Sequence, residues 1–280
     1  MLPTKLSVIQ MPPNGEARDA VISTRAGGQV FVAQQGSGHP LVWVAGLGDD
    51  HTGWAAQVEE FAAKYTCVSF DNRGIGQSTV LPGPYTMQDF ADDAHDVVTE
   101  LGIGPVVAIG SSMGGAICQR WAIQYPDDLS GLVLAGTWAE HDPLLDVLLR
   151  HWISLGQAGQ DQRLLESLFL GCYSGQYLRD HADVVDEFLA TPLPDLEGLM
   201  AATAACRDHD ALEELAKIRI PTLVISGSLD TVARPDLVHR IADRIPDARL
   251  EEIESGHMMM WEQPEEFARL INKHLGRMTT

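Results

Sequence analysis

The sequence predicts an α/β protein whose mostly parallel sheet is covered by helices on both faces. Two observations predict this class. Apolar runs of strand length alternate with segments of helical spacing along most of the chain. The strand-like runs carry few polar residues, as parallel strands buried on both faces do. With 280 residues, 45% of them hydrophobic, the chain is long enough to build a full core.

The N-terminal part is predicted to begin with a β-hairpin. Residues 19–25 and 29–34 are short β-rich runs, and Gly27 and Gly28 separate them. A buried strand, a helix and a further strand follow at 40–45, 54–64 and 66–70. Thr86 is the predicted N-cap of a helix that runs to about Leu101.

The later strands and helices alternate regularly. A strand at 105–109 leads into a helix at 113–124, and residues 131–135 form another buried strand. The C-terminal part is predicted as strand, helix, strand and helix at 220–226, 235–245, 248–253 and 264–274. Together with the hairpin, these runs predict a sheet of eight strands.

Residues 138–205 interrupt the alternation of strands and helices. They contain no strand-like run and read as several short helices, and a long insertion after a sheet strand is usually a lid. We therefore predict a core made of residues 1–137 and 206–280, with a helical lid over 138–205. The bulky apolar residues of the insertion either line a pocket or form its own core: Trp138, Trp152, Leu164, Leu165, Phe169, Tyr173, Tyr177 and Phe188.

Charge and cysteine usage exclude several classes of partner. A net charge of −20 argues against binding to nucleic acid and to anionic membranes. The four cysteines form no Cys-x-x-Cys pair, which favours free thiols in a reducing compartment, so we expect a cytoplasmic protein. Residues 1–15 contain one lysine and no apolar stretch, which predicts no signal peptide. The oligomeric state is left open between monomer and homodimer.

Ser112 is the predicted nucleophile. It lies in Gly110-Ser111-Ser112-Met113-Gly114, between a predicted strand and a predicted helix. A strand that turns at once into a helix presents the serine hydroxyl at the carboxyl edge of the sheet, in a strained conformation. The helix N-terminus behind it favours developing negative charge, so the backbone amide of Met113 is a predicted oxyanion donor. Ser111 precedes the apex and is expected only to pack or to make a local hydrogen bond.

A serine hydroxyl needs a base to take its proton, and the base needs a carboxylate to orient it. His257 follows Gly256 after the last predicted strand, and Asp230 follows the strand at 220–226 and a glycine turn. Glu140 is an alternative acid, in a poorer position. The predicted triad is Ser112, Asp230 and His257.

The order nucleophile, acid, base is that of the α/β-hydrolases. Four blocks of the chain resemble this family, and in particular its esterases, lactonases and carbon–carbon hydrolases: Ala45–Gly48, Asp71–Ser78, Gly110–Gly114, and Gly256-His257 with Glu262 and Pro264. The resemblance implies the α/β-hydrolase fold and a second oxyanion amide at Leu47. The chain departs from the family where the usual His-Gly pair is Ala45-Gly46.

The resemblance implies hydrolysis of a small carboxylic ester or lactone without a metal or other cofactor, most like the 3-oxoadipate enol-lactonases. Substrate contacts are predicted at Gly46, Trp138 and Met258. Two other chemistries stay open: carbon–carbon bond hydrolysis, with Arg120 as a weak candidate anchor, and perhydrolase or haloperoxidase chemistry, in which peroxide replaces water. A non-catalytic receptor or scaffold is a further alternative.

Two further motifs are given structural interpretations. Asp49, Asp50 and His51 are interpreted as polar lining and a helix start rather than as metal ligands, because they lie in one loop without a partner pair. Arg73 is expected to tie loops together through Asp71.

Overall fold

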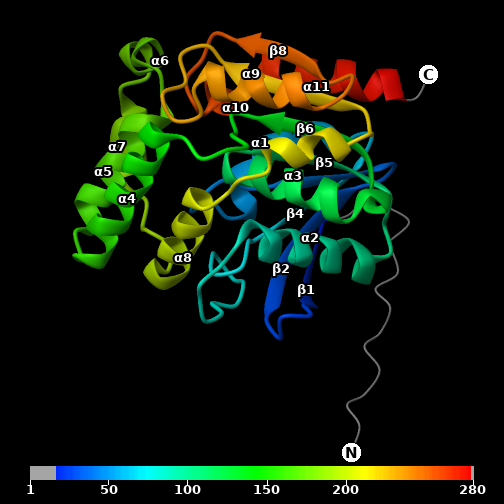
Figure 1. Cartoon of the computed structure of the whole chain (residues 1–280), viewed down its shortest axis with the longest axis horizontal. Helices are drawn as coiled ribbons and strands as arrows, with labels where there is room; N and C mark the ends of the chain where they lie inside the picture. Colours follow the sequence, from blue (N-terminus) through cyan, green and yellow to red (C-terminus); the bar gives the residue numbers. More distant parts are fainter. Residues whose placement is uncertain (1–16, 279–280) are drawn as a thin grey trace, which may run out of the picture.

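The computed structural model describes residues 17–278 as a twisted eight-stranded sheet with helices on both faces (Figure 1). The strand order is β1-β2-β4-β3-β5-β6-β7-β8. The pairs that β2 makes with β1 and β4 are antiparallel, and the other pairs are parallel, which confirms the predicted fold class. The strands are Arg18–Ser23 (β1), Gln29–Gly36 (β2), Pro40–Val44 (β3), Thr66–Phe70 (β4), Val106–Ser111 (β5), Leu129–Ala135 (β6), Thr222–Gly227 (β7) and Arg249–Ile253 (β8).

Alternation along the central strands divides the interior into two cores. On β3, Val42 and Val44 face one core, whereas Leu41 and Trp43 face the other. Successive side chains of a strand point to opposite faces, so both sets must be apolar when helices cover both faces. All four residues are fully buried. This is why the strand reads as a continuous apolar run in the sequence.

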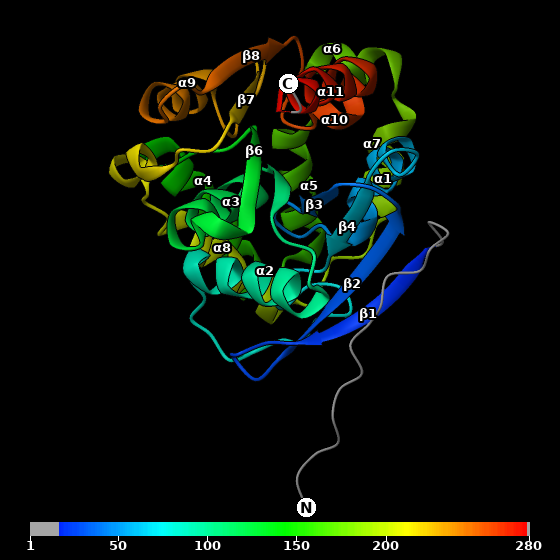
Figure 2. The ribbon, with the colours of Figure 1, turned by 90° about the vertical axis from the view of Figure 1, so that its right-hand side faces the viewer.

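Different helices close the two cores, as Figure 2 shows. One face of the sheet is covered by Met87–Leu101 (α2), Met113–Gln124 (α3) and Pro235–Arg244 (α9). The other is covered by Ala55–Phe61 (α1), Met259–Glu262 (α10) and Pro264–Met278 (α11). Short 3-10 helices are found at His51–Trp54 (η1), Pro126–Asp128 (η2) and Leu212–Lys217 (η3). Thr86 caps α2 in a reciprocal capping box with Asp89, as the sequence predicts for the cap.

Five α-helices lie between β6 and β7, at one side of the sheet (Figure 1, left). They are Pro143–Gln157 (α4), Asp161–Cys172 (α5), Gly175–Asp180 (α6), Asp183–Ala190 (α7) and Leu196–Arg207 (α8). The last of them returns to the core, where Gly198 lies so close to Gly74 that any side chain at position 198 would collide with the Gly74 backbone. The chain therefore leaves and rejoins the sheet on neighbouring strands.

Two predictions concern features beyond the sheet. All four cysteines are free, and three of them are buried, whereas Cys172 is partly exposed. None of the described helices combines the length and the apolar character that a membrane span requires. The prediction for residues 1–15 lies outside the described residues.

Candidate active site

Ser112 occupies the sharp turn between β5 and α3. Its φ of 55° and ψ of −120° lie in a region that side chains rarely adopt, which stores strain at this residue. The Ser112 N–H donates to the Ala135 carbonyl at 2.9 Å, and its carbonyl accepts from Thr137 Oγ1 at 2.8 Å. The strained backbone is therefore fixed from both sides.

Glycines make the tight turn possible. A Cβ at Gly110 would collide with the Gly114 carbonyl, and one at Gly114 would collide with the Val44 carbonyl on β3. Any side chain at these positions would push α3 away from the sheet. The two glycines thus allow the α3 N-terminus to sit directly behind Ser112.

Asp230 and His257 form a buried pair at the ends of β7 and β8. His257 Nδ1 lies 2.7 Å from Asp230 Oδ2, and the two side chains are 9% and 0% exposed. The other oxygen, Asp230 Oδ1, accepts from the N–H groups of Val232 and Ala233 at 2.8 and 3.0 Å. These bonds orient the carboxylate, which in turn orients the imidazole.

Two opposing effects act on the His257 imidazole. Burial lowers the pKa of His257, because a desolvated imidazolium is costly, but the neighbouring Asp230 carboxylate outweighs this effect. The net result is a pKa above the ordinary value for histidine. An imidazole whose charged form is stabilised by a fixed carboxylate is well suited to accept a proton during a reaction.

A cavity of about 540 Å³ lies over His257 and Ser112. Ser112 and His257 both line it, and no hydrogen bond joins them among the residues that the structure describes. Catalytic contacts are often long in unliganded enzymes and tighten when substrate binds. The predicted contact residues Gly46, Trp138 and Met258 all line the same cavity.

The loop after β3 supplies the amide predicted as an oxyanion donor. Leu47 lines the cavity, and Met113 begins α3 immediately after Ser112. In the described part of the chain, neither backbone N–H donates a hydrogen bond to the protein. Two unpaired donors beside a serine are what the stabilisation of a tetrahedral oxyanion requires.

The helices between β6 and β7 supply much of the apolar cavity wall. Of the bulky residues singled out in the sequence, Leu164 and Phe169 pack away from the cavity. The others line it: Trp138, Trp152, Leu165, Tyr173, Tyr177 and Phe188. Leu164 and Phe169 therefore belong to the core of the insertion, whereas the other residues of the set line the pocket.

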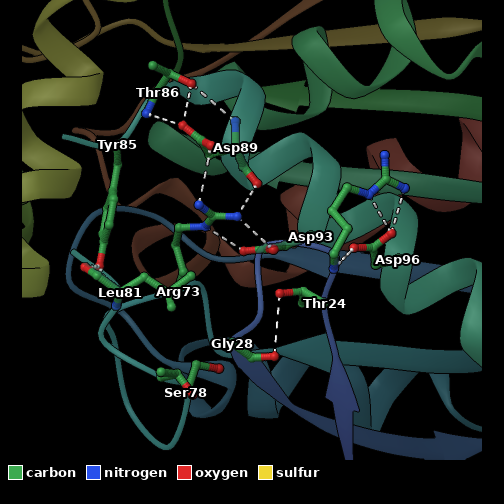
Figure 3. Close-up of polar contacts among 12 residues, drawn as sticks. Thr24, Gly28, Arg73, Ser78, Leu81, Tyr85, Thr86, Asp89, Asp93 and Asp96 are labelled. Carbon is green, nitrogen blue, oxygen red and sulfur yellow. Dashed lines mark hydrogen bonds and ion pairs between the residues drawn. The ribbon is translucent and has the colours of Figure 1, made fainter. Parts of the chain in front are cut away.

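The expectation for Arg73 is wrong. Its guanidinium donates to both oxygens of Asp93, at 2.7 and 2.8 Å, and to the Asp89 carbonyl, all on α2 (Figure 3). Asp71 instead accepts from the N–H groups of His51 and Gln77. The sequence could not distinguish these partners, because Asp93 is 20 residues away and approaches Arg73 only through the packing of α2 on the sheet.

Other candidates are engaged elsewhere. Arg120, the candidate anchor, pairs with Glu214 at 2.6 Å and does not line the cavity. Glu140, the alternative acid, pairs with Arg240 at 2.8 Å. In the loop at 49–51, Asp50 caps η1 and His51 Nδ1 lies 2.6 Å from Asp71, so only Asp49 lines the cavity.

Thr137 and Ser174 contribute to the site without having been predicted. Thr137 fixes the Ser112 carbonyl, and Ser174 donates from N–H and Oγ to the two oxygens of Glu262 at 2.7 and 2.6 Å. No local sequence signal marks either residue. The block that contains Glu262 resembles the histidine loop of the family, but this resemblance does not predict a contact with Ser174.

The fold and these residues define a hydrolase of the α/β class, and comparison with known proteins agrees. A family model described as alpha/beta hydrolase fold matches residues 39–264, so the chain belongs to this family. It is similar to a Mycobacterium tuberculosis protein named "Putative non-heme bromoperoxidase BpoC", with 31% identity over 82% of this chain and 91% of that protein. It is also similar to 3-oxoadipate enol-lactonase 2 of Acinetobacter baylyi, with 26% identity over 85% of this chain and 88% of the lactonase.

Among solved structures, the chain resembles a thermophilic esterase from Thermogutta terrifontis. The TM-score is 0.86 at 30% sequence identity, over 94% of this chain and all of the esterase. The match extends beyond the sheet to nearly the whole chain. It therefore includes the region between β6 and β7 that builds much of the cavity wall.

Proposed function

We propose that this protein hydrolyses a small carboxylic ester or lactone through an acyl-enzyme on Ser112. The observation that carries the proposal is that His257, paired with Asp230, lines the same apolar cavity as the strained Ser112. The enol-lactonase and esterase relatives support the same reaction class. The segment over 138–205 is proposed to act as the lid of this cavity.

In the proposed mechanism, each group of the site has a defined role. Ser112 Oγ attacks the carbonyl carbon while His257 Nε2 takes the serine proton, and Asp230 stabilises the imidazolium. The amides of Leu47 and Met113 bind the oxyanion of the tetrahedral intermediate. His257 then returns the proton to the leaving alcohol and activates water, which releases the acid and regenerates the serine.

The test compares wild type with Ser112→Ala on p-nitrophenyl esters of graded chain length and on simple lactones. We expect kcat to fall by about 10³-fold or more in Ser112→Ala, because the nucleophile is lost. Ser111→Ala is the matched control and should retain most of the activity. Undiminished turnover by Ser112→Ala would contradict the mechanism, and labelling of wild type by a fluorophosphonate would identify the activated serine independently.

The BpoC relative favours one alternative use of the same groups. Hydrogen peroxide in place of water would attack the acyl-enzyme and release a peracid. Adding peroxide and bromide to the ester assay tests this: formation of a peracid that brominates an indicator dye, lost in Ser112→Ala, would establish perhydrolysis. Carbon–carbon hydrolysis receives no such support, because Arg120 is held by Glu214.

A further inference from the structure

Asp49 places a carboxylate at the reacting end of the cavity. A Cβ built on Gly46 would lie 3.3 Å from Asp49 Oδ2 and 3.7 Å from Ser112 Cβ, so the acid and the nucleophile flank the same glycine. Asp49 also lines the cavity. Its charge acts on groups across the cavity, since it helps to raise the pKa values of His257 and Tyr173.

The Asp49 carboxylate has no structural partner. Among residues 17–278 it makes no hydrogen bond or ion pair, in contrast to Asp50, whose side chain caps η1. The protein atoms around the cavity raise the pKa of Asp49 to about 6, although the residue is exposed to solvent, and the neighbouring Asp50 adds to this effect. At neutral pH the group is therefore mainly an unpaired carboxylate that faces the cavity.

The remaining charges around the cavity do not neutralise Asp49. Glu187 on α7 is a second carboxylate in the lining, and His257 is its only basic side chain among the described residues. No lysine or arginine of that part of the chain lines the cavity. Asp49, which flanks Gly46 together with Ser112, therefore makes this end of the cavity less favourable for an anion than for an uncharged group.

We propose that Asp49 determines the charge preference of the site, so that the enzyme accepts uncharged and cationic esters or lactones and rejects those carrying a carboxylate. This inference rests on the proposed hydrolase function and narrows its substrate class. A substrate carboxylate close to Asp49 would be repelled by its like charge, whereas an ammonium group there would gain a partner.

The experiment uses ester pairs that differ only in charge. One pair places the charge on the acyl half, with the p-nitrophenyl ester of adipic acid monoamide against p-nitrophenyl hydrogen adipate. The other places it on the leaving group, with para-carbamoyl and para-carboxyl phenyl acetate. In wild type, kcat/KM for the anionic member of at least one pair should be about tenfold or more below that of its neutral partner. Asp49→Asn should remove most of this gap by raising activity on the anion.

Asp50→Asn is the matched control. It removes one negative charge from the adjacent residue, whose carboxylate does not line the cavity, and should leave the ratio of the two kcat/KM values unchanged. Equal activity of wild type on both members of both pairs, or an unchanged ratio in Asp49→Asn, would overturn the proposal.

The pH dependence of the anionic-to-neutral ratio of kcat/KM is a second test. This ratio would not change with pH if Asp49 had only a structural role. The groups around Asp49 that titrate or carry charge are Asp50, Cys172, Tyr173, Glu187 and His257. Changes in His257 affect both esters of a pair and cancel in their ratio. The anionic-to-neutral ratio should therefore rise in wild type as pH falls through about 6, and stay flat in Asp49→Asn.

Binding separates failure of this inference from failure of the proposed reaction. Ser112→Ala and the double variant Ser112→Ala, Asp49→Asn are titrated calorimetrically with the same esters. If Ser112→Ala binds the anionic ester more weakly than the neutral one, and the double variant binds the two equally, the charge preference is supported. This holds even if wild type cleaves no ester. Equal binding of both members by Ser112→Ala, with normal turnover of neutral esters by wild type, would refute the preference and leave the hydrolase function intact.

Discussion

At the scale of single residues, the candidate site depends on backbone bonds more than on side-chain contacts. Ser112 is held by the Ala135 carbonyl and by Thr137, while Asp230 is held by the N–H groups of two following residues. Such bonds fix the groups before substrate arrives. The reacting atoms therefore need little reorganisation when charge develops.

The Asp230–His257 pair makes a specific prediction for pH dependence. His257 must be neutral to accept a proton, and its pKa lies above the ordinary value of 6.5, so activity should be lost as pH falls through a midpoint above 6.5. The measurement is kcat/KM for a neutral ester across pH. A midpoint below 6.5 in wild type would contradict the assignment of His257 as base.

Asp230→Asn tests the cause of this shift. The variant keeps the shape of the side chain but removes the charge that opposes burial, so the midpoint should move below that of wild type. The rate should also fall, by about 10⁴-fold if the amide stabilises the wrong tautomer. Glu140→Gln, which changes the rejected alternative acid, should leave the midpoint in place.

The site residues were predictable to different degrees, for a physical reason. Ser112, Asp230 and His257 each follow a strand and a turn, and this local pattern is visible in the sequence. Asp49 was interpreted only as polar lining, because its lack of a partner depends on where His51 and Asp50 turn. Arg73 was assigned the wrong partner for a similar reason, since its ion pair spans a loop and a helix.

At the scale of elements, Glu262 joins the helices between β6 and β7 to the histidine loop. The carboxylate at the end of α10 accepts both bonds from Ser174, between α5 and α6, and the Met258 N–H donates to the Cys172 carbonyl. Gly256 lies against the same contact, because a Cβ there would be 2.6 Å from Ser174 N. The position of His257 therefore depends on the α5–α6 junction.

Replacing Glu262 should reveal this dependence. Glu262→Ala leaves the buried Ser174 N–H without a partner and should lower the free energy of unfolding by about 2–3 kcal/mol. Glu262→Gln is the matched control, since its amide can still accept one bond and donate another. Urea unfolding measures both variants, and an unchanged midpoint for Glu262→Ala would show that the junction does not depend on this contact.

Element boundaries were predictable where both local pattern and packing agreed. The helix predicted at 113–124 has those bounds as α3, because Ser112 forces its start and its residues pack on the sheet. The region over 138–205 was recognised as helical without internal boundaries. Its five helices are set by contacts with one another and with the core, such as Gly198 against Gly74, which no local spacing records.

At the scale of the whole molecule, the buried side chain of His209 makes the free energy of unfolding depend on pH. His209 lies beneath α3, where its Nε2 is 3.1 Å from Gln119 Oε1. Burial lowers the pKa of His209 to about 3, and Arg120 adds to the effect. The folded protein therefore keeps His209 neutral at a pH where the unfolded chain protonates it.

The sign of the effect follows from this difference in bound protons. Between the ordinary value of 6.5 and about 3, the unfolded state binds more protons at this position, so stability falls as pH falls. One such group accounts for up to about 1.4 kcal/mol per pH unit. Urea unfolding of wild type and His209→Gln at neutral and mildly acidic pH should show a shallower slope for the variant. His151→Gln, at an exposed histidine, should retain the wild-type slope.

The path of the chain between β6 and β7 has a consequence for how such proteins diversify. The Ala211 N–H donates to the Ala139 carbonyl at 2.7 Å, so the two ends of the segment that contains α4–α8 lie side by side beyond the carboxyl end of β6. A segment anchored in this way can be exchanged between homologues as a cassette, without altering the order of the strands. Recombination at these two points would change which substrates fit the cavity, while the candidate catalytic residues on the sheet would stay the same.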